Sequence, residues 1–150
     1  MRRAMIYSGL LAAALLLPSG GKELGKIKPV ETLLIKAEKG QIILRTDTED
    51  LGIGNTVEEA MCDLEKTTAG RIYPDTTLYL LVDETAEENI EALKAYLKGS
   101  TRLCIVEGDV DLQEAGEYLG THKPGIKLKK WKKGGSLQHL RNYRGKMKIN

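Results

Sequence analysis

The chain has 150 residues, of which 41% are hydrophobic and 29% are charged, and its formal net charge is +2. These proportions are typical of a globular domain with its own core and exclude a chain that is disordered throughout. With one Trp and no Phe, the core must be largely aliphatic. The small net charge conceals a division, because all 21 acidic residues precede residue 121, whereas residues 121–150 contain ten Lys or Arg. The sequence therefore predicts an acidic body and a basic tail.

Residues 1–21 have the pattern of an export signal. Two arginines precede an apolar run at residues 6–17, and small residues at positions 18–21 follow it. The run has about 12 residues, fewer than the roughly 20 that a membrane-spanning helix needs. A buried N-terminal helix and retention as an uncleaved anchor remain as alternatives. We expect an exported, extracytoplasmic, membrane-associated protein in which residues 22–29 form a tether.

The domain is expected to begin with a β-hairpin. Residues 30–38 and 41–46 are strand-like and flank Lys39-Gly40, a pair that suits a tight turn. Residues 47–54 form a turn-rich link that has room for a short extended piece.

The rest of the domain alternates helices with apolar strands. Thr56 and Glu59 form a capping box, Thr85 and Glu88 form a second one, and Asp109 or Asp111 begins a third helix. The order of strand, helix and strand predicts a βαβ unit with parallel pairing. The fold class is therefore α/β, a single domain over residues 30–120 with a mixed sheet of about four strands and about three helices. The predicted helices span residues 56–66, 85–98 and about 111–120, and the predicted strands span residues 77–82 and 102–107.

Residues 121–150 form the basic tail. Residues 126–131 suit an extended segment. Residues 136–143 suit a short helix, because three apolar residues recur at i, i+3 and i+6. We expect the tail to be partly disordered or docked on the body.

Cysteines and histidines give little support for metal or triad chemistry. Cys62 and Cys104 lie outside any metal-binding spacing. They either pair as a disulfide, which export permits, or fill small apolar positions, which is the favoured interpretation. His122 and His139 have no Asp, Glu or Cys partner nearby, which argues against a catalytic triad. No cofactor is expected.

Gly52, Gly54 and Thr56 precede a helix, as in a phosphate-binding loop. The Gly-Lys-Ser/Thr sequence or third glycine that such loops require is missing. Glu58 and Glu59 in the first helical turn also repel a phosphate. We therefore interpret this segment as a turn and a helix cap.

Carboxylates follow two strands that we expect to be parallel. Asp83 and Glu84 follow the first strand, and Asp109 and Asp111 follow the second. All four would then lie at one edge of the sheet, where α/β proteins bind ligands. The less favoured functional alternative is a small metal-dependent enzyme or metal-binding domain that holds Mg²⁺ or Ca²⁺ through Asp83, Asp109 and Asp111. Acidic residues also suit these positions as helix caps.

The basic tail is the favoured binding surface. Export makes an anionic membrane surface accessible, and such a surface attracts Lys and Arg by about 1 kcal/mol each. Trp131 is of a type enriched at membrane interfaces. Nucleic acid is not the expected partner, and a solvated or docked tail remains an alternative. The residues expected to contact the membrane or a protein partner are Lys127, Lys129, Lys130, Trp131, Lys132 and Lys133.

Two segments resemble a known family. Residues 54–64 (GNTVEEAMCDL) and residues 71–82 (RIYPDTTLYLLV) are similar to the N-terminal domain of the Ger(x)C family, the lipoprotein C subunits of spore germinant receptors. Lys22-Glu23-Leu24 lies where that family has a Glu-Leu pair. The resemblance covers about residues 18–115. It implies a non-enzymatic, membrane-apposed subunit involved in spore germination, with receptor subunits as partners.

The chain departs from that family in two respects. Gly20 or Gly21 stands where the lipidated cysteine would be, so the chain cannot be acylated there. Its length is also well short of the multi-domain length of the family. We therefore expect a non-catalytic binding or assembly protein that is lipoprotein-like but held at the membrane by residues 6–17 or by the basic tail.

Overall fold

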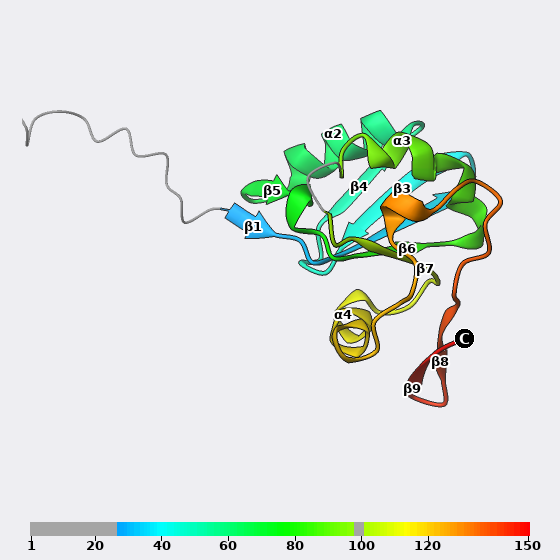
Figure 1. The fold of residues 1–150 in the computed structure, drawn as a ribbon. Helices are drawn as coiled ribbons and strands as arrows, with labels where there is room; N and C mark the ends of the chain where they lie inside the picture. The colour runs from blue at the N-terminus through cyan, green and yellow to red at the C-terminus, as the bar shows by residue number, and fades with distance from the viewer. Residues whose placement is uncertain (1–26, 98–100) are drawn as a thin grey trace, which may run out of the picture.

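A five-stranded mixed sheet is the middle of three layers (Figure 1). The computed structural model describes residues 27–97 and 101–150. Helices α2 (Val57–Thr67) and α3 (Ile90–Lys94) cover one face of the sheet, and α4 (Leu112–Thr121) lies against the other. This arrangement confirms the predicted α/β class, with a mixed sheet and about three helices.

The sheet has an antiparallel half and a parallel half. Its strands lie in the order β4-β3-β2-β6-β7, in which β2, β3 and β4 are antiparallel neighbours and β6 and β7 run parallel to β2. At the β2–β3 turn, Lys39 and Gly40 have φ of 52° and 80°, the left-handed pair that two-residue hairpins use. The strands are Thr32–Glu38 (β2), Gln41–Thr46 (β3), Leu51–Gly54 (β4), Tyr79–Val82 (β6) and Cys104–Glu107 (β7).

The parallel strands are buried on both faces, which divides the core in two. Along β2, Leu33 and Ile35 pack beneath α2 and α3, whereas Leu34 packs against α4. This alternation is the period of two that a strand imposes. In the antiparallel half α2 covers one face, and on the other face Leu51 and Ile53 of β4 remain 43% and 39% exposed.

Helix α2 begins at the predicted cap. The Thr56 hydroxyl accepts a hydrogen bond from the Glu59 amide at 3.1 Å. The Glu59 carboxylate in turn accepts the Asn55 amide at 2.8 Å. The cap thereby satisfies one backbone donor of the first turn and one just before the N-cap, a variant of the capping box.

Helix α2 packs so closely on β4 that only glycine fits beneath it. A Cβ on Gly52 would lie 2.5 Å from Leu64 Cβ, and a Cβ on Gly54 would lie 2.5 Å from the Ala60 nitrogen. Both glycines therefore serve the contact between helix and strand.

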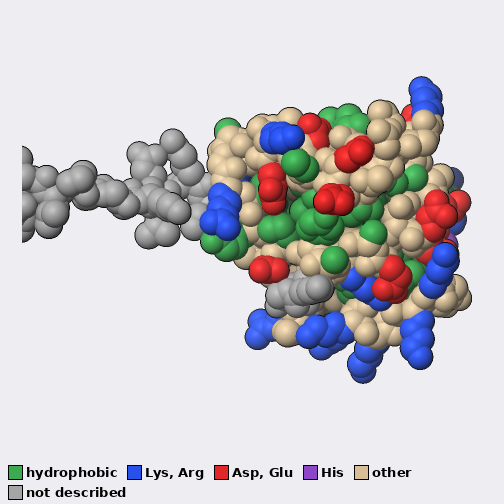
Figure 2. Space-filling model, turned by 90° about the horizontal axis from the view of Figure 1, so that it is seen from above, with side chains coloured by type: hydrophobic (Ala, Val, Ile, Leu, Met, Phe, Trp, Pro, Cys, Tyr) green, Lys and Arg blue, Asp and Glu red, His purple; other side chains and the backbone are tan. Residues whose placement is uncertain are grey.

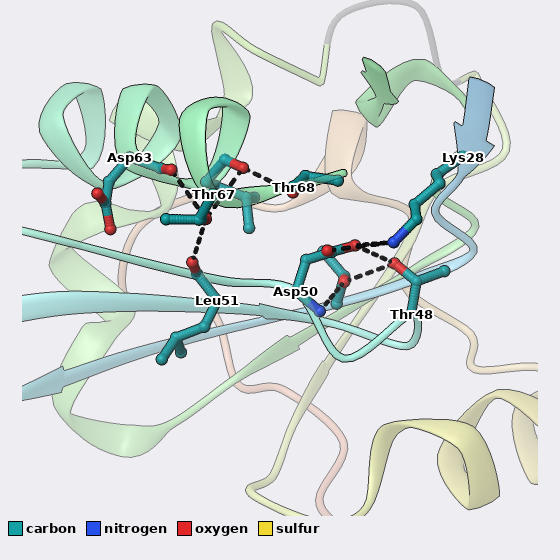
Figure 3. A network of polar contacts seen from close by, with 9 residues as sticks. Lys28, Thr48, Asp50, Leu51, Asp63, Thr67 and Thr68 are labelled. Atoms are coloured by element: carbon teal, nitrogen blue, oxygen red, sulfur yellow. Dashed lines mark hydrogen bonds and ion pairs between the residues drawn. The ribbon is translucent and has the colours of Figure 1, made fainter. Parts of the chain in front are cut away.

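Side chains of α2 also close the outer edge of β4 (Figure 3). The Thr67 hydroxyl donates to the Leu51 carbonyl at 2.8 Å, as Figure 3 shows. The Ile53 amide donates to Asp63 Oδ2 at 2.9 Å. In the register of β3 and β4 these two backbone groups point away from β3. Because α2 satisfies them, this edge is closed to pairing with another strand.

The second predicted helix begins earlier and is less regular than expected. Asp83, not Thr85, is the N-cap: its carboxylate accepts hydrogen bonds from the Thr85 amide, at 3.2 Å, and from the Thr85 hydroxyl. A 3₁₀ segment, η3 (Glu84–Asn89), then leads into α3. Asp83 directly follows a strand, so its backbone is extended as an N-cap requires.

A second, two-stranded sheet joins β1 (Ile27–Pro29) to β5 (Arg71–Tyr73) in parallel. Residues 27–29 were expected in the tether, and that part of the prediction is wrong because their backbone pairs with β5. A 3₁₀ turn, η2 (Pro74–Thr76), follows β5.

The predicted export signal, the remainder of the tether and the end of the second helix fall on residues 1–26 and 98–100, outside the described part. None of the helices in residues 27–97 and 101–150 is long and apolar enough to cross a membrane.

The basic tail is docked along the outer edge of β7. The Ile105 amide donates to the Ile126 carbonyl at 3.0 Å, and the Glu107 amide donates to the Gln138 carbonyl at 2.9 Å. The segment predicted as extended contains instead a 3₁₀ turn, η4 (Leu128–Lys130). Both edges of the main sheet are therefore covered, β4 by α2 and β7 by the tail.

The tail continues into a hairpin, not the helix predicted for residues 136–143. Strand β8 (Leu140–Tyr143) pairs with β9 (Lys146–Ile149). Between them Arg144 and Gly145 have φ of 53° and 74°, again the left-handed pair of a two-residue turn. The hairpin lies on the α4 side of the sheet, where Leu140 is 1% exposed (Figure 1).

Candidate functional site

The carboxyl ends of the parallel strands border a pocket of about 360 Å³. Asp83 follows β6, Asp109 follows β7, and both line the pocket, as predicted from the parallel order of the strands. The base of the β8–β9 hairpin forms the opposite wall. The charged lining residues are Asp83, Glu84, Glu107, Asp109, His139 and Arg141.

Asp109 is already paired with a cation. Lys36 Nζ, which comes from the adjacent strand β2, lies 2.9 Å from Asp109 Oδ2. The hydrogen bond to Asp109, and then the charge of Asp109, raise the pKa of Lys36, so the ammonium remains protonated beside the carboxylate. A divalent cation at Asp109 would be repelled by this ammonium.

The three predicted metal ligands do not form one site. Asp83 and Asp109 share the pocket, but Asp111 lines another one, with Arg45 and Asp47. Asp111 caps α4, since its carboxylate accepts the Glu114 amide at 2.9 Å. Within residues 27–97 and 101–150, no three His, Cys, Asp or Glu side chains are grouped so as to hold a metal ion.

Sequence reasoning missed the pairing of His139 with Glu107. His139 Nδ1 lies 2.9 Å from Glu107 Oε1, and the two residues form a parallel bridge at the end of β7. Glu107 and His139 are far apart in the sequence, and no local sequence pattern predicts that they pair. An imidazole oriented by a carboxylate is one part of an acid–base dyad. Ser136 lines an adjoining pocket. Within the described part of the chain, the His139 ring is paired with Glu107 and has no hydrogen bond to a hydroxyl or thiol that could act as a nucleophile.

Trp131 is not available as a membrane anchor. Its side chain is 4% exposed and packs in the core cluster that contains α3. Lys94 Nζ lies 5.0 Å from the ring centroid and 3.2 Å from the Trp131 carbonyl, to which it donates. The predicted interfacial role of Trp131 is therefore corrected: the indole fixes the tail to the body.

The cations of the tail remain free for a partner. All ten Lys and Arg of residues 121–150 are exposed, and within the described residues none of them forms an ion pair. They include the predicted contact residues Lys127, Lys129, Lys130, Lys132 and Lys133. Viewed onto α2 and α3, acidic side chains surround an apolar area, and Lys and Arg gather along one border (Figure 2).

The two cysteines are separate free thiols. Cys62 is exposed on α2, and Cys104 is half-buried in β7. Burial raises the pKa of the Cys104 thiol, and nearby Lys127 and Lys123 oppose this only in part. Cys104 fits the favoured interpretation of a small apolar position beside the core, whereas Cys62 does not, because it is exposed.

Comparison of the chain with protein-family models, curated proteins and solved structures finds no match.

Proposed function

We propose that this chain is a non-catalytic binding or assembly protein that lies against an anionic membrane surface through its basic tail. The observation that carries the proposal is a set of ten exposed cations, which form no ion pair with the described residues, on a tail that is itself fixed to the body. A docked tail presents its charges in a defined arrangement and loses less conformational entropy on binding than a disordered one.

The fold offers a separate surface for a protein partner. Leu51 and Ile53 are exposed apolar residues on the face of the sheet opposite α2. Solvent-exposed apolar groups that lie together mark interaction sites more often than single exposed residues do. The similarity to the N-terminal domain of the Ger(x)C family supports an assembly role near a membrane, with receptor subunits as the kind of partner.

Binding of the full chain to lipid vesicles tests this proposal. We expect binding to vesicles with anionic headgroups that weakens steeply from 50 to 300 mM salt, because the screening length falls from about 14 Å to about 6 Å over this range. Neutral vesicles serve as the control and report any salt-independent binding through residues 6–17. Equal binding to the two kinds of vesicle at every salt concentration would overturn the proposal.

Deletion of residues 121–150 is unsuitable as a test. It removes Leu128, Trp131 and Leu140, which are all buried in the core, and it uncovers the edge of β7. Substitutions of exposed cations separate the charge of the tail from its structural role.

A further inference from the structure

We propose that the outer face of the β8–β9 hairpin, not the segment around η4, is the surface that contacts anionic lipid headgroups. This inference rests on the proposed function and assigns the contact to particular residues. The outer face consists of Arg141, Tyr143, Lys146 and Lys148, with Arg144 in the turn.

The register of the hairpin places these residues on one face. Arg141 is paired with Lys148, and Tyr143 is paired with Lys146. Paired residues of an antiparallel ladder share a face, and side chains two positions apart along a strand do so as well. All four side chains are exposed.

The inner face explains why the hairpin holds this arrangement. Leu140 is buried, and Met147 and Ile149 pack against the same cluster as α4. The base is fixed to β7, since Gly108 approaches the Leu140 carbonyl so closely that a Cβ on Gly108 would lie 2.6 Å from it. The outer face is thus fixed in its outward orientation.

The outer face carries no acidic residue, although Arg141 also lines the pocket that contains Asp83, Glu84, Glu107 and Asp109. Like charges directly opposite each other in a ladder destabilise the pair, and Arg141 faces Lys148. In the described residues neither side chain forms an ion pair. A bound anion would relieve this repulsion, so the arrangement favours an anionic partner.

Tyr143 favours a lipid surface over a nucleic acid. Its side chain is 56% exposed, and tyrosine suits the boundary between headgroups and acyl chains. Arg144 Cζ and Lys148 Nζ lie 5.2 Å and 5.8 Å from the ring centroid, over the ring. These cations compete with the base stacking through which exposed aromatic side chains bind single strands.

The η4 turn, which carries Lys129 and Lys130, is anchored on the opposite face of the sheet, whereas Lys123 and Lys127 line a pocket with Cys104 and Tyr79. Leu128 and Trp131 pack in the cluster of α2 and α3, whereas Leu140 packs in the cluster of α4. Lys129 and Lys130 therefore belong to a segment that is anchored differently from the hairpin, and their contribution can be tested separately. The hairpin is the better candidate of the two because its aromatic residue is exposed, whereas Trp131 is buried.

Two matched double variants of the full chain test the assignment. Arg141→Gln with Lys148→Gln removes two cations from the hairpin, and Lys129→Gln with Lys130→Gln removes two from η4. We expect the salt-sensitive affinity for vesicles containing anionic phospholipid to fall about 30-fold in the hairpin variant, from about 1 kcal/mol per cation. The η4 variant should stay within about 2-fold of the wild type, since the proposal places its charges outside the contact. Circular dichroism should show both variants folded, and Arg144→Gln with Lys146→Gln provides a second hairpin variant with the same expected loss.

The outcomes separate this inference from the proposed function. Equal losses in the hairpin and η4 variants would overturn the hairpin assignment while leaving membrane binding in place. A wild type without salt-sensitive vesicle binding would overturn both. Hairpin-dependent binding to a single-stranded oligonucleotide, without binding to vesicles, would overturn the choice of lipid as the partner.

Discussion

The folded structure destabilises the ionised form of the Asp47 carboxylate. One carboxylate oxygen accepts the amides of Glu31 and Thr32, each at 3.1 Å. The other oxygen is buried and has no hydrogen-bond partner among the described residues. Burial raises the pKa of Asp47 above its ordinary value of 3.8, and the backbone hydrogen bonds offset this only in part. The charged form is therefore disfavoured in the folded state.

We expect Asp47→Asn to stabilise the protein at pH 7. The amide oxygen keeps the two backbone hydrogen bonds, and the buried charge is removed. Because the pKa is raised in the folded state, the wild type gains stability from this residue as the pH falls through the folded pKa toward 3.8. The difference between the two proteins should thus shrink as the pH falls, as urea unfolding at several pH values would show. A difference independent of pH would contradict this explanation.

At the scale of elements, the contact of α2 with β4 depends on the absence of side chains. Gly52 and Gly54 lie directly under Ala60 and Leu64, so the helix axis approaches the strand closely. Gly120 provides a contrast, because it lies within α4 and a Cβ there meets nothing within 4 Å.

Gly52→Ala and Gly120→Ala should therefore have opposite effects. We expect Gly52→Ala to cost about 1–3 kcal/mol, since the new methyl group meets the backbone of α2 and forces the helix outward. Gly120→Ala should gain up to about 1 kcal/mol, the usual advantage of alanine in a helix. Chemical denaturation of both variants measures these changes. Similar effects in the two variants would argue against close packing as the reason for the glycine at position 52.

The elements that sequence reasoning predicted well are those with local signals. The Lys39-Gly40 turn and the Thr56 cap each lie within a few residues of what they organise, and the structure has both. The β8–β9 hairpin carried an equally local signal, the Arg144-Gly145 turn. The helix predicted for residues 136–143 depends on three apolar residues spaced three apart. So few apolar residues do not distinguish a helix from a strand.

The candidate sites were harder to predict because they depend on contacts distant in the sequence. The parallel order of β6 and β7 brought Asp83 and Asp109 together as expected. The partner of Asp109, Lys36, comes from another strand. Trp131 was misassigned because its cationic neighbours suggested an exposed surface, whereas burial of the indole depends on its contact with α3.

At the scale of the whole molecule, the tail and the body share one core. Trp131 packs in the same cluster as α2 and α3, and Leu140 packs in the cluster of α4. The tail also satisfies backbone groups at the edge of β7. We therefore expect the described residues, 27–97 and 101–150, to unfold as one cooperative unit.

Two spectroscopic signals should therefore report one transition. Trp131 is the single tryptophan and reports on the tail, whereas far-ultraviolet circular dichroism reports mainly on the helices of the body. We expect the two urea unfolding curves to coincide within error. If the fluorescence changed at a lower urea concentration than the circular dichroism, the tail would be an appendage that detaches first.

The closure of β7 by the tail has a consequence for how the protein is made. The ribosome synthesises the body before the residues that complete its core, and at about 5–20 residues per second the 30 positions after Gly120 take roughly 2–6 seconds. During that interval the nascent chain exposes an unpaired strand and two incomplete apolar clusters. Exposed strand edges and apolar surface favour aggregation, so the body is vulnerable until the tail docks.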